Sequence, residues 1–280
     1  IEVLDGIEKI TGKKPIFEKI DLREKSAVQN FFKKHQDIIG VIHFAASKAV
    51  GESVENPLLY YENNINSLVY VLQELANLPQ ANFIFSSSCT VYGQAEKMPI
   101  TEDASVQPAN SPYGNTKQIG EEIINDVAKV TNINAVLLRY FNPIGAHSSA
   151  EIGELPIGVP QNLVPYITQT AYGLRKELSV YGNDYPTPDG TAIRDYIHVD
   201  DLARAHMLAI QYCLAFEGDH YMLNLGSGQG YSNADIVVAV AKLIGPVDTV
   251  QGPRRAGDPD RLVASGSLAA VTLGWTPEHS

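Results

Sequence analysis

The feature that most constrains this chain is an alternation of short apolar runs with longer segments of helical periodicity. In the first half, apolar runs typical of strands lie at Pro15–Ile20, Gly40–Ala45, Asn82–Ser87 and Asn134–Phe141. Helical patterns lie between them at Glu24–Lys34, Pro57–Leu75 and Pro112–Val130. Strands that alternate with helices in this way form βαβ units, whose strands run parallel. The sequence therefore predicts an α/β fold with a doubly wound parallel sheet.

After Asn142 the pattern changes to a loop-rich stretch, AHSSAEIGELPIGVPQN, which has several Gly and Pro residues and no clear period. Beyond it we expect helices at Asn162–Lys176, Asp200–Leu214 and Ser232–Ile244, and short strands at Leu178–Tyr181, Tyr196–Val199 and Tyr221–Leu225. We therefore predict a main α/β domain at residues 1–142 and a smaller C-terminal region at residues 143–280. Residues 190–215 are expected to pack back on the first domain.

The charge of the chain narrows its possible partners. The formal net charge is −11 over 280 residues. Nucleic acids and anionic membranes are bound through clustered Lys and Arg, which this sequence does not display. No apolar run approaches the ~20 residues that a bilayer span needs, and no signal segment opens the chain. We expect neither a nucleic-acid nor a membrane partner.

The two cysteines, Cys89 and Cys213, are too few for a disulfide framework. Neither lies in a C-x-x-C or His-flanked metal-binding pattern. The sequence therefore predicts a reducing compartment, the cytoplasm, and no metal site.

The most informative short stretch is Ser111-Pro112-Tyr113-Gly114-Asn115-Thr116-Lys117. Ser111 is a candidate N-cap and Pro112 occupies the first helical position, so Tyr113 and Lys117 project from one face of a helix start. A nearby ammonium group favours the phenolate, which would make Tyr113 a usable general base. The alternative is an ordinary helix with a packed Tyr and a solvated Lys, and the short Y-x-x-x-K pattern alone does not exclude it.

A second group of hydroxyls supports the catalytic interpretation. Ser86, Ser87 and Ser88 directly follow the apolar strand that ends near Phe85. The carboxyl ends of parallel strands line the ligand crevice of such sheets, so a hydroxyl there is well placed to contact a substrate. Ser88 beside a Tyr–Lys pair can pass a substrate proton to the Tyr. Ser86 and Ser87 can equally be simple caps of the strand.

At this point the chain resembles the extended short-chain dehydrogenase/reductases and, among them, the UDP-glucose 4-epimerases. The resemblance rests on six stretches in order, HFAASKAVGESVENPLLYYENN, SSSCTVYG, SPYGNTK, LLRYFNPIGAH, YGNDYPTPDGTAIRDYIHVDDLA and GPRRAGD. It implies a Rossmann-like NAD-binding domain, a UDP-hexose-binding C-terminal region and NAD as the cofactor. The implied activity interconverts UDP-glucose and UDP-galactose through a 4-keto intermediate, a reaction of galactose metabolism.

The resemblance also implies the residues of the site. Tyr113 is similar to the catalytic base, Lys117 to its partner and ribose ligand, and Ser88 to the contact for the substrate hydroxyl. The implied NAD contacts are Asp21, Leu22, Phe44, Ala45, Ala46, Lys48, Asn63, Ser86, Tyr113, Lys117 and Phe141. The implied substrate contacts are Ser88, Tyr113, Asn142, Asn162, Tyr181, Arg194, Arg255 and Asp258. The two arginines suit a pyrophosphate because guanidinium groups bind phosphate oxygens in a forked geometry.

Two positions depart from the family's pattern. The Gly-rich turn that lets the backbone approach the pyrophosphate of NAD is missing, and the chain begins at Ile1 instead of Met. We interpret the chain as part of a longer, NAD-binding protein, starting after the first βα unit and the following strand, roughly at the second helix. The second position is Leu262, where relatives carry bulky or small residues against the hexose. A side chain of intermediate size leaves open whether N-acetylated sugars fit.

Several related activities compete with this prediction. A nucleotide-sugar dehydratase would carry an Asp-Glu pair where this chain has Cys89 and Thr90, and decarboxylases of the group use a Glu nearby. The absence of a carboxylate at these positions argues against both activities. A UDP-N-acetylglucosamine 4-epimerase shares the mechanism and stays an alternative. A non-catalytic dinucleotide-binding protein of the same fold is the alternative from another class. The resemblance also implies a homodimer, formed through the helices at Pro57–Leu75 and Pro112–Val130.

Overall fold

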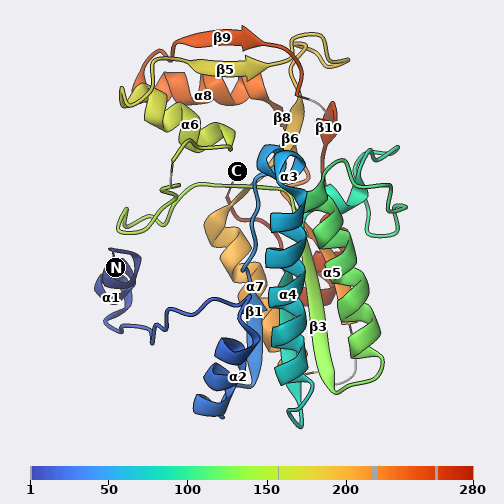
Figure 1. The fold of residues 1–280 in the computed structure, drawn as a ribbon. Coiled ribbons are helices and arrows are strands. Elements are labelled where there is room, and N and C mark those ends of the chain that lie inside the picture. Colours follow the sequence, from blue (N-terminus) through green and yellow to red (C-terminus); the bar gives the residue numbers. More distant parts are fainter. Residues whose placement is uncertain (1, 157, 216–219, 256–257, 280) are drawn as a thin grey trace.

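Four parallel strands form the main sheet of the protein (Figure 1). In the computed structural model, which describes residues 2–156, 158–215, 220–255 and 258–279, they follow the order β1-β2-β3-β7. Their bounds are Gly40–His43, Ala81–Ser86, Ile133–Tyr140 and His220–Leu225. The predicted α/β class with parallel strands is confirmed.

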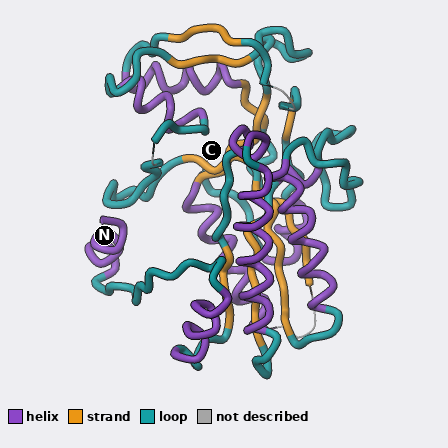
Figure 2. Tube along the Cα trace, viewed as in Figure 1, coloured by secondary structure: helices purple, strands orange, loops and turns teal. Residues whose placement is uncertain are grey.

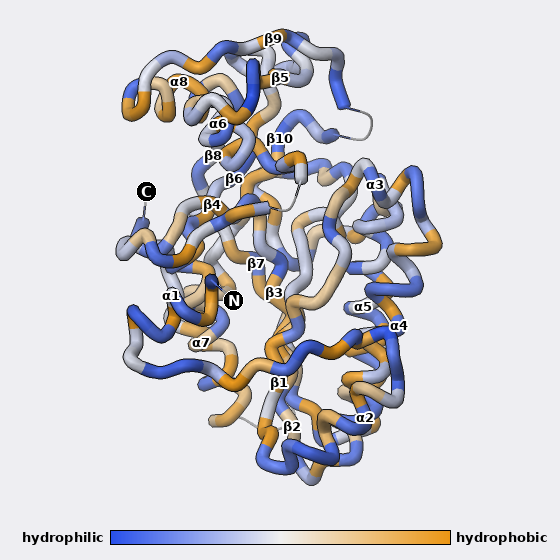
Figure 3. The backbone as a smooth tube through the Cα atoms, turned by 60° about the vertical axis from the view of Figure 1, so that its left-hand side comes forward, coloured by the Kyte–Doolittle hydropathy of each residue, from blue (hydrophilic) through white to orange (hydrophobic). Residues whose placement is uncertain are grey.

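Helices cover both faces of this sheet. On one face lie α2 (Lys25–Lys34), α4 (Pro57–Leu75) and α5 (Pro112–Ala128); on the other lie α7 (Val199–Ala215) and α9 (Ser267–Leu273). The alternation of side chains along β2 explains the two layers, because Phe83 and Phe85 enter the core under α4 whereas Ile84 enters the core under α7. Burial of each such side chain contributes roughly 1.5–3 kcal/mol. Figure 3 shows the apolar strands between the helical layers.

The start of α5 follows from its first residues. Ser111 has an extended backbone and its Oγ accepts a hydrogen bond from the backbone N–H of Gly114. Pro112 occupies the first turn, where its missing N–H costs no hydrogen bond. The predicted helix start is confirmed. It fixes Tyr113 and Lys117 in the first turns of α5, at the carboxyl end of the sheet.

The C-terminal region carries smaller sheets (Figure 2). One contains β4 (Asn142–Ile144), β6 (Ile193–His198), β8 (Gly230–Ser232) and β10 (Arg261–Leu262), and the other pairs β5 (Leu178–Tyr181) with β9 (Thr249–Gly252). Two helices, α6 (Leu163–Ala171) and α8 (Asn233–Ile244), contact each other beneath the β5–β9 pair.

A buried carboxylate joins the two parts. The side chain of Asp195, on β6, accepts hydrogen bonds from the backbone N–H groups of Ser227, Gly228 and Ala264. Asp195 is fully buried, and this burial raises its pKa. Because Ser227 follows β7 of the main sheet and Ala264 follows β10, this one side chain fixes the C-terminal region against the main sheet.

Some sequence predictions are wrong at the element level. Pro15–Ile20 is not a strand, and Ile16 and Phe17 are exposed. Among the described residues, β1 pairs only with β2, so this segment has no strand beside it with which to form a ladder. The predicted helix at Asn162–Lys176 ends at Ala171, shortly before Gly173 at φ 84°. The strand predicted at Tyr196–Val199 begins at Ile193.

Two helices of the first half were not predicted, α1 (Glu2–Thr11) and α3 (Val50–Glu55). A short 3-10 turn, Cys89–Tyr92, also follows the serines after β2. Among the described helices, none is both long and apolar enough to cross a membrane.

Candidate active site

The three predicted catalytic residues meet where β2 ends and α5 begins. Lys117 is buried, and its Nζ donates a hydrogen bond to the backbone oxygen of Ser86 at 2.5 Å. The same Nζ lies 5.9 Å from the centre of the Tyr113 ring. The Ser88 hydroxyl is hydrogen-bonded to Tyr113. The structure therefore brings a phenol, an ammonium group and a hydroxyl together at the carboxyl end of the sheet.

The electrostatics of this group differ from the sequence prediction. Burial raises the pKa of Tyr113 above its usual value, and the Ser88 hydrogen bond opposes this effect. The net shift of the Tyr113 pKa is thus opposite to the predicted lowering by Lys117, whose ammonium donates its hydrogen bond to the Ser86 carbonyl. Burial lowers the pKa of Lys117 to about 8, and the Glu121 carboxylate opposes that shift. Without ligand, Tyr113 is a phenol at neutral pH.

Part of the predicted cofactor site lies beside β1. Phe44 and Ala45 follow that strand and, with Leu22, line a hollow of about 420 Å³. Phe44 is more than half exposed, and its ring lies 4.8 Å from that of His206. Ala46 is the next residue along this segment. An apolar wall beside a buried ammonium group at the strand ends fits a dinucleotide, whose bases need flat apolar surface and whose ribose hydroxyls need donors.

The polar cofactor candidates have other partners in the ligand-free chain. Asp21 accepts two hydrogen bonds from Arg23 Nε and one from its Nη2, and these lower the pKa of Asp21 to about 2. Lys48 lies 3.9 Å from a carboxylate oxygen of Glu154. The Asn63 amide donates to Ser47. Each of these contacts is partly or fully exposed, so a ligand can compete for it.

The side chains of the neighbouring residues Tyr140 and Phe141 have different surroundings. The resemblance placed Phe141 against the nicotinamide. The Phe141 ring is buried in an apolar cluster with Leu262. The Tyr140 hydroxyl is hydrogen-bonded to the Ser86 side chain and acts electrostatically on Tyr113. Tyr140 therefore lies beside the predicted catalytic group, which consists of Ser88, Tyr113 and Lys117. The sequence analysis did not select Tyr140. Its position as the last residue of β3 was the signal that could have identified it.

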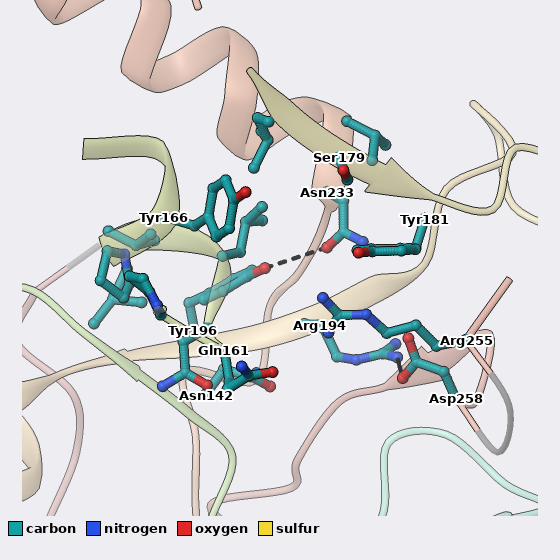
Figure 4. A pocket seen from close by; sticks show the side chains of 18 of the residues that line it. Asn142, Gln161, Tyr166, Ser179, Tyr181, Arg194, Tyr196, Asn233, Arg255 and Asp258 are labelled. Atoms are coloured by element: carbon teal, nitrogen blue, oxygen red, sulfur yellow. Dashed lines mark hydrogen bonds and ion pairs between the residues drawn. The ribbon is translucent and has the colours of Figure 1, made fainter. Parts of the chain in front are cut away.

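The predicted substrate residues from the second half gather around a cavity of about 350 Å³ (Figure 4). Its lining includes Asn142, Asn162, Tyr181, Arg194, Arg255 and Asp258. Figure 4 shows Arg194, Arg255 and Asp258 together at one end of this cavity. The Arg255 guanidinium lies 4.2 Å from the centre of the Tyr181 ring, so an aromatic face and a cation share one wall.

Arg194 is held by several acceptors. Its Nη2 donates to the Asp258 carboxylate and, at 2.8 Å, to the backbone oxygen of Pro259. Its Nη1 donates to the backbone oxygen of Ile193 at 2.8 Å. The Arg194 side chain is only 9 % exposed. A guanidinium fixed in this way is ready to bind an anion without losing much side-chain entropy.

The cavity also has walls that the sequence analysis missed. They include Gln161, Leu163, Tyr166, Ser179, Tyr196 and Asn233. Tyr196 and Asn233 are in hydrogen-bond contact at 3.5 Å, across β6 and the first residue of α8. Their spacing in the sequence gives no hint of this contact. Only the pairing of β6 with β8 brings them together.

The cavity adjoins the catalytic group. The charge of Arg194 acts on the Cys89 thiol, which directly follows Ser88, although burial has the larger effect and raises the Cys89 pKa to about 11. Leu262 lies beside Arg194 in the β6–β10 register and packs in the same cluster as Cys89. Arg194 and Leu262 therefore connect the cavity with the segment that carries Ser88.

The sequence analysis expected no metal site. Within the described residues, His198, Asp200 and His279 bring one possible ligand atom each within 4.8 Å of the others. However, Nδ1 of His198 accepts the backbone N–H of Asp200, and Nδ1 of His279 contacts the Asp201 carboxylate. These nitrogens are engaged within the protein, and we assign no metal to this group.

Comparison with known proteins identifies the family in two steps. Residues 4–226 match the NAD dependent epimerase/dehydratase family, and the chain belongs to it. Within that family the chain belongs with the UDP-glucose 4-epimerases. The enzyme of Schizosaccharomyces pombe is 46% identical over 286 residues, covering 100% of this chain and 80% of the relative. The UDP-glucose 4-epimerase of Erwinia amylovora is 44% identical, and the match covers 98% of this chain and 81% of the relative.

Solved structures agree with this placement. The UDP-glucose 4-epimerase of Bifidobacterium longum, in complex with NAD+ and UDP, has a TM-score of 0.94 and 43% identity. That of Stenotrophomonas maltophila, with bound NAD and formylated UDP-arabinopyranose, has a TM-score of 0.93 and 44% identity. Each comparison covers 99% of this chain and 82% of the solved one. NAD is therefore the cofactor of the family to which this chain belongs.

Proposed function

We propose that this chain interconverts UDP-glucose and UDP-galactose with NAD as cofactor. The observation that carries the proposal is the position of Tyr113, Lys117 and Ser88 at the strand ends, next to a cavity that holds Arg194 and Arg255. A tyrosine whose phenolate can accept a proton and a pair of guanidinium groups that can bind a pyrophosphate are the two requirements of this reaction.

In this proposal the cavity holds the UDP group. Arg194 and Arg255 bind the pyrophosphate, and Asp258 keeps Arg194 in place. Tyr181 offers its ring beside the uracil, and Asn142 and Asn162 offer amides to the nucleotide and the sugar. The hexose is then nearest to Leu262 and the catalytic group. Because charged contacts anchor the UDP and the side chains that cluster with Leu262 are apolar, the sugar can turn while the nucleotide stays bound.

The protein's own residues move the proton. The base is the phenolate form of Tyr113, which the positive charges of Lys117 and of a bound oxidised nicotinamide favour over the phenol. Ser88 hydrogen-bonds the 4′-hydroxyl of the hexose and relays its proton to this phenolate oxygen as the hydroxyl becomes a ketone. NAD, held by Lys117 and by the apolar wall of Leu22, Phe44 and Ala45, would supply hydride transfer at carbon 4 of the sugar, out and back on opposite faces of the 4-keto form. Lys117 holds a positive charge beside Tyr113 and has donors free for a ribose hydroxyl, since its Nζ makes one hydrogen bond within the described residues. Tyr113 finally returns the proton to the new hydroxyl.

In this proposal the two regions of the chain bind different ligands. Residues 1–142, together with 190–215, hold the cofactor, and residues 143–280 mainly hold the UDP-sugar. The contacts of α7 with β2 and β3 support this assignment for the returning segment.

We further propose a homodimer formed through α4 and α5, which contact each other side by side on one face of the main sheet. The proposed compartment is the reducing cytoplasm. Both cysteines are buried free thiols, which supports it.

A direct assay tests the function. Purified protein is incubated with UDP-galactose, with and without added NAD, and UDP-glucose is quantified by chromatography. We expect UDP-glucose to form until the two sugars reach equilibrium, and the reverse reaction to reach the same ratio. No UDP-glucose under either condition would overturn the proposal.

A further inference from the structure

Three consecutive serines at the end of β2 contact three residues of α5 spaced one turn apart. Ser88 is hydrogen-bonded to Tyr113, and the Ser86 carbonyl accepts from Lys117. The Ser87 hydroxyl donates to Oε1 of Glu121 at 2.5 Å. Residues four apart on a helix share one face, so Glu121 is the third member of the row that begins with Tyr113. The reaction described above uses the first two contacts and leaves the third without a role.

Glu121 belongs to a buried ion pair. Its two carboxylate oxygens accept hydrogen bonds from Nε and Nη2 of Arg139, on β3, at 2.9 and 2.5 Å. The exposed fractions of the two side chains are 2% for Arg139 and 6% for Glu121. Two charges in the interior cost several kcal/mol of desolvation each, and apolar residues of similar size are often as stable. Stability alone therefore does not account for the pair.

The carboxylate of Glu121 acts on Lys117. The Lys117 ammonium lies 4.8 Å from the Phe85 ring and donates to one carbonyl, a setting in which burial favours the neutral amine. The Glu121 charge favours the ammonium form and partly restores the lowered pKa. Arg139 and Ser87 hold this carboxylate on both of its oxygens, so it cannot swing away.

The groups that face Lys117 from the neighbouring elements are few. From β1 comes His43, which burial and the Lys117 charge keep neutral, with a pKa of about 4. From β3 come Tyr140, bonded to Ser86, and Arg139. Among the described residues, the charge that raises the Lys117 pKa is that of Glu121.

We propose that Glu121, fixed by Ser87 and Arg139, is a positioning residue that keeps the Lys117 side chain charged beside Tyr113. This inference rests on the proposed function for its consequence in catalysis. The charge of Lys117 itself can be measured without turnover.

The main variants remove the negative charge of Glu121 in two ways. Glu121→Gln removes it and leaves Arg139 unpaired, which can unfold the chain. The double change Glu121→Leu with Arg139→Met replaces the whole pair by apolar side chains and keeps the volume. Glu122→Gln, on the exposed side of the same helix, is the matched control. Ser87→Ala keeps both charges and removes only one hydrogen bond, so it tests the proposal if the charge variants do not fold.

Two readouts are taken on the full chain. Lysine is labelled with carbon-13 at Cε, and the signal of Lys117, identified by its loss in Lys117→Arg, is followed from pH 6 to pH 10. In the folded Glu121 variants we expect the Lys117 titration to move down by about one pH unit, since a close opposite charge shifts a pKa by about 1–3 units. Ser87→Ala should shift it less, in the same direction, and Glu122→Gln should leave it unchanged.

The second readout is the pH profile of kcat. We expect its alkaline limb to move down together with the Lys117 titration, about tenfold less activity at a pH one unit above the wild-type midpoint. An unchanged Lys117 titration in the folded double variant, or in Ser87→Ala if the others do not fold, would overturn the inference. If the titration shifts but the wild type shows no epimerase activity, the proposed function fails and the role of Glu121 stands.

Discussion

The Arg194 guanidinium donates a hydrogen bond to the Asp258 carboxylate across the rim of the cavity, and this contact joins β6 to the segment before β10. It leaves Arg194 with a fixed direction and Arg255 as the second cation at the same end of the cavity (Figure 4). The pairing supports the proposed binding of the substrate's pyrophosphate at this end of the cavity.

The role of Arg255 can be tested by Arg255→Ala. Loss of a charged hydrogen bond of about 1.5–3 kcal/mol should raise the KM for UDP-galactose roughly ten- to a hundredfold. The neighbouring Arg254 pairs with Asp184 and is the control, so Arg254→Ala should change KM little. Steady-state kinetics measure both, and an equal effect of the two changes would reject the assignment.

Leu262 should limit the size of the hexose. Its side chain is buried beside Arg194 in the β10–β6 register, and Leu262→Ala opens space there. We expect the ratio of kcat/KM for UDP-N-acetylgalactosamine to that for UDP-galactose to rise, although the protein loses about 2–5 kcal/mol of stability. Comparing the two substrates on one preparation separates the two effects. An unchanged ratio would mean that other walls set the size limit.

The cysteines should be inert in the folded protein. Burial raises the pKa of Cys89 to about 11 and that of Cys213 to about 12, so neither forms the reactive thiolate near neutral pH. A thiol reagent that absorbs light on reaction should therefore label no cysteine at pH 8 until the chain unfolds. Labelling within seconds in native buffer would contradict this burial.

His43 should make the stability of the fold depend on pH. Burial lowers its pKa from the usual 6.5 to about 4, so the unfolded chain binds more protons than the folded one between these values. The contribution is fully present above pH 6.5 and is lost as the pH falls through 4, a total on the order of 3 kcal/mol.

Urea unfolding measures this contribution. Replacement of His43 by Phe should flatten the pH dependence of the unfolding free energy between pH 4 and 6.5. Replacement of the partly exposed His147 by Gln should leave that dependence unchanged. An equally steep dependence in the Phe variant would place the titrating group elsewhere.

The sequence predicted the elements that carry strong local signals. Pro57–Leu75 and Leu178–Tyr181 are observed with the predicted bounds, and the cap at Ser111 fixes α5 as expected. Pro57–Leu75 has long helical periodicity and α5 has a sharp start, whereas Leu178–Tyr181 is a short apolar run. The proximity of Ser88, Tyr113 and Lys117 could be predicted because one strand end and the first turns of one helix determine it.

Other features depend on pairing between distant segments, which leaves no local pattern. The two residues of β10 are a strand only because they lie beside β6. Pro15–Ile20 has the composition of a strand but no neighbouring strand among the described residues. The contact of Ser87 with Glu121 was equally hidden, since its geometry requires the packing of α5 on β2.

The account depends most on Tyr113 as the group that takes the proton from the 4′-hydroxyl. Tyr113→Phe keeps the ring and removes the acid–base oxygen, and Tyr172→Phe, at an exposed tyrosine, is the control. The decisive measurement is kcat for UDP-galactose in both variants after circular dichroism has shown that they fold. We predict a loss of roughly 10²–10⁴-fold for Tyr113→Phe and none for Tyr172→Phe; a Tyr113→Phe protein that turns over within twofold of the wild type would contradict the account.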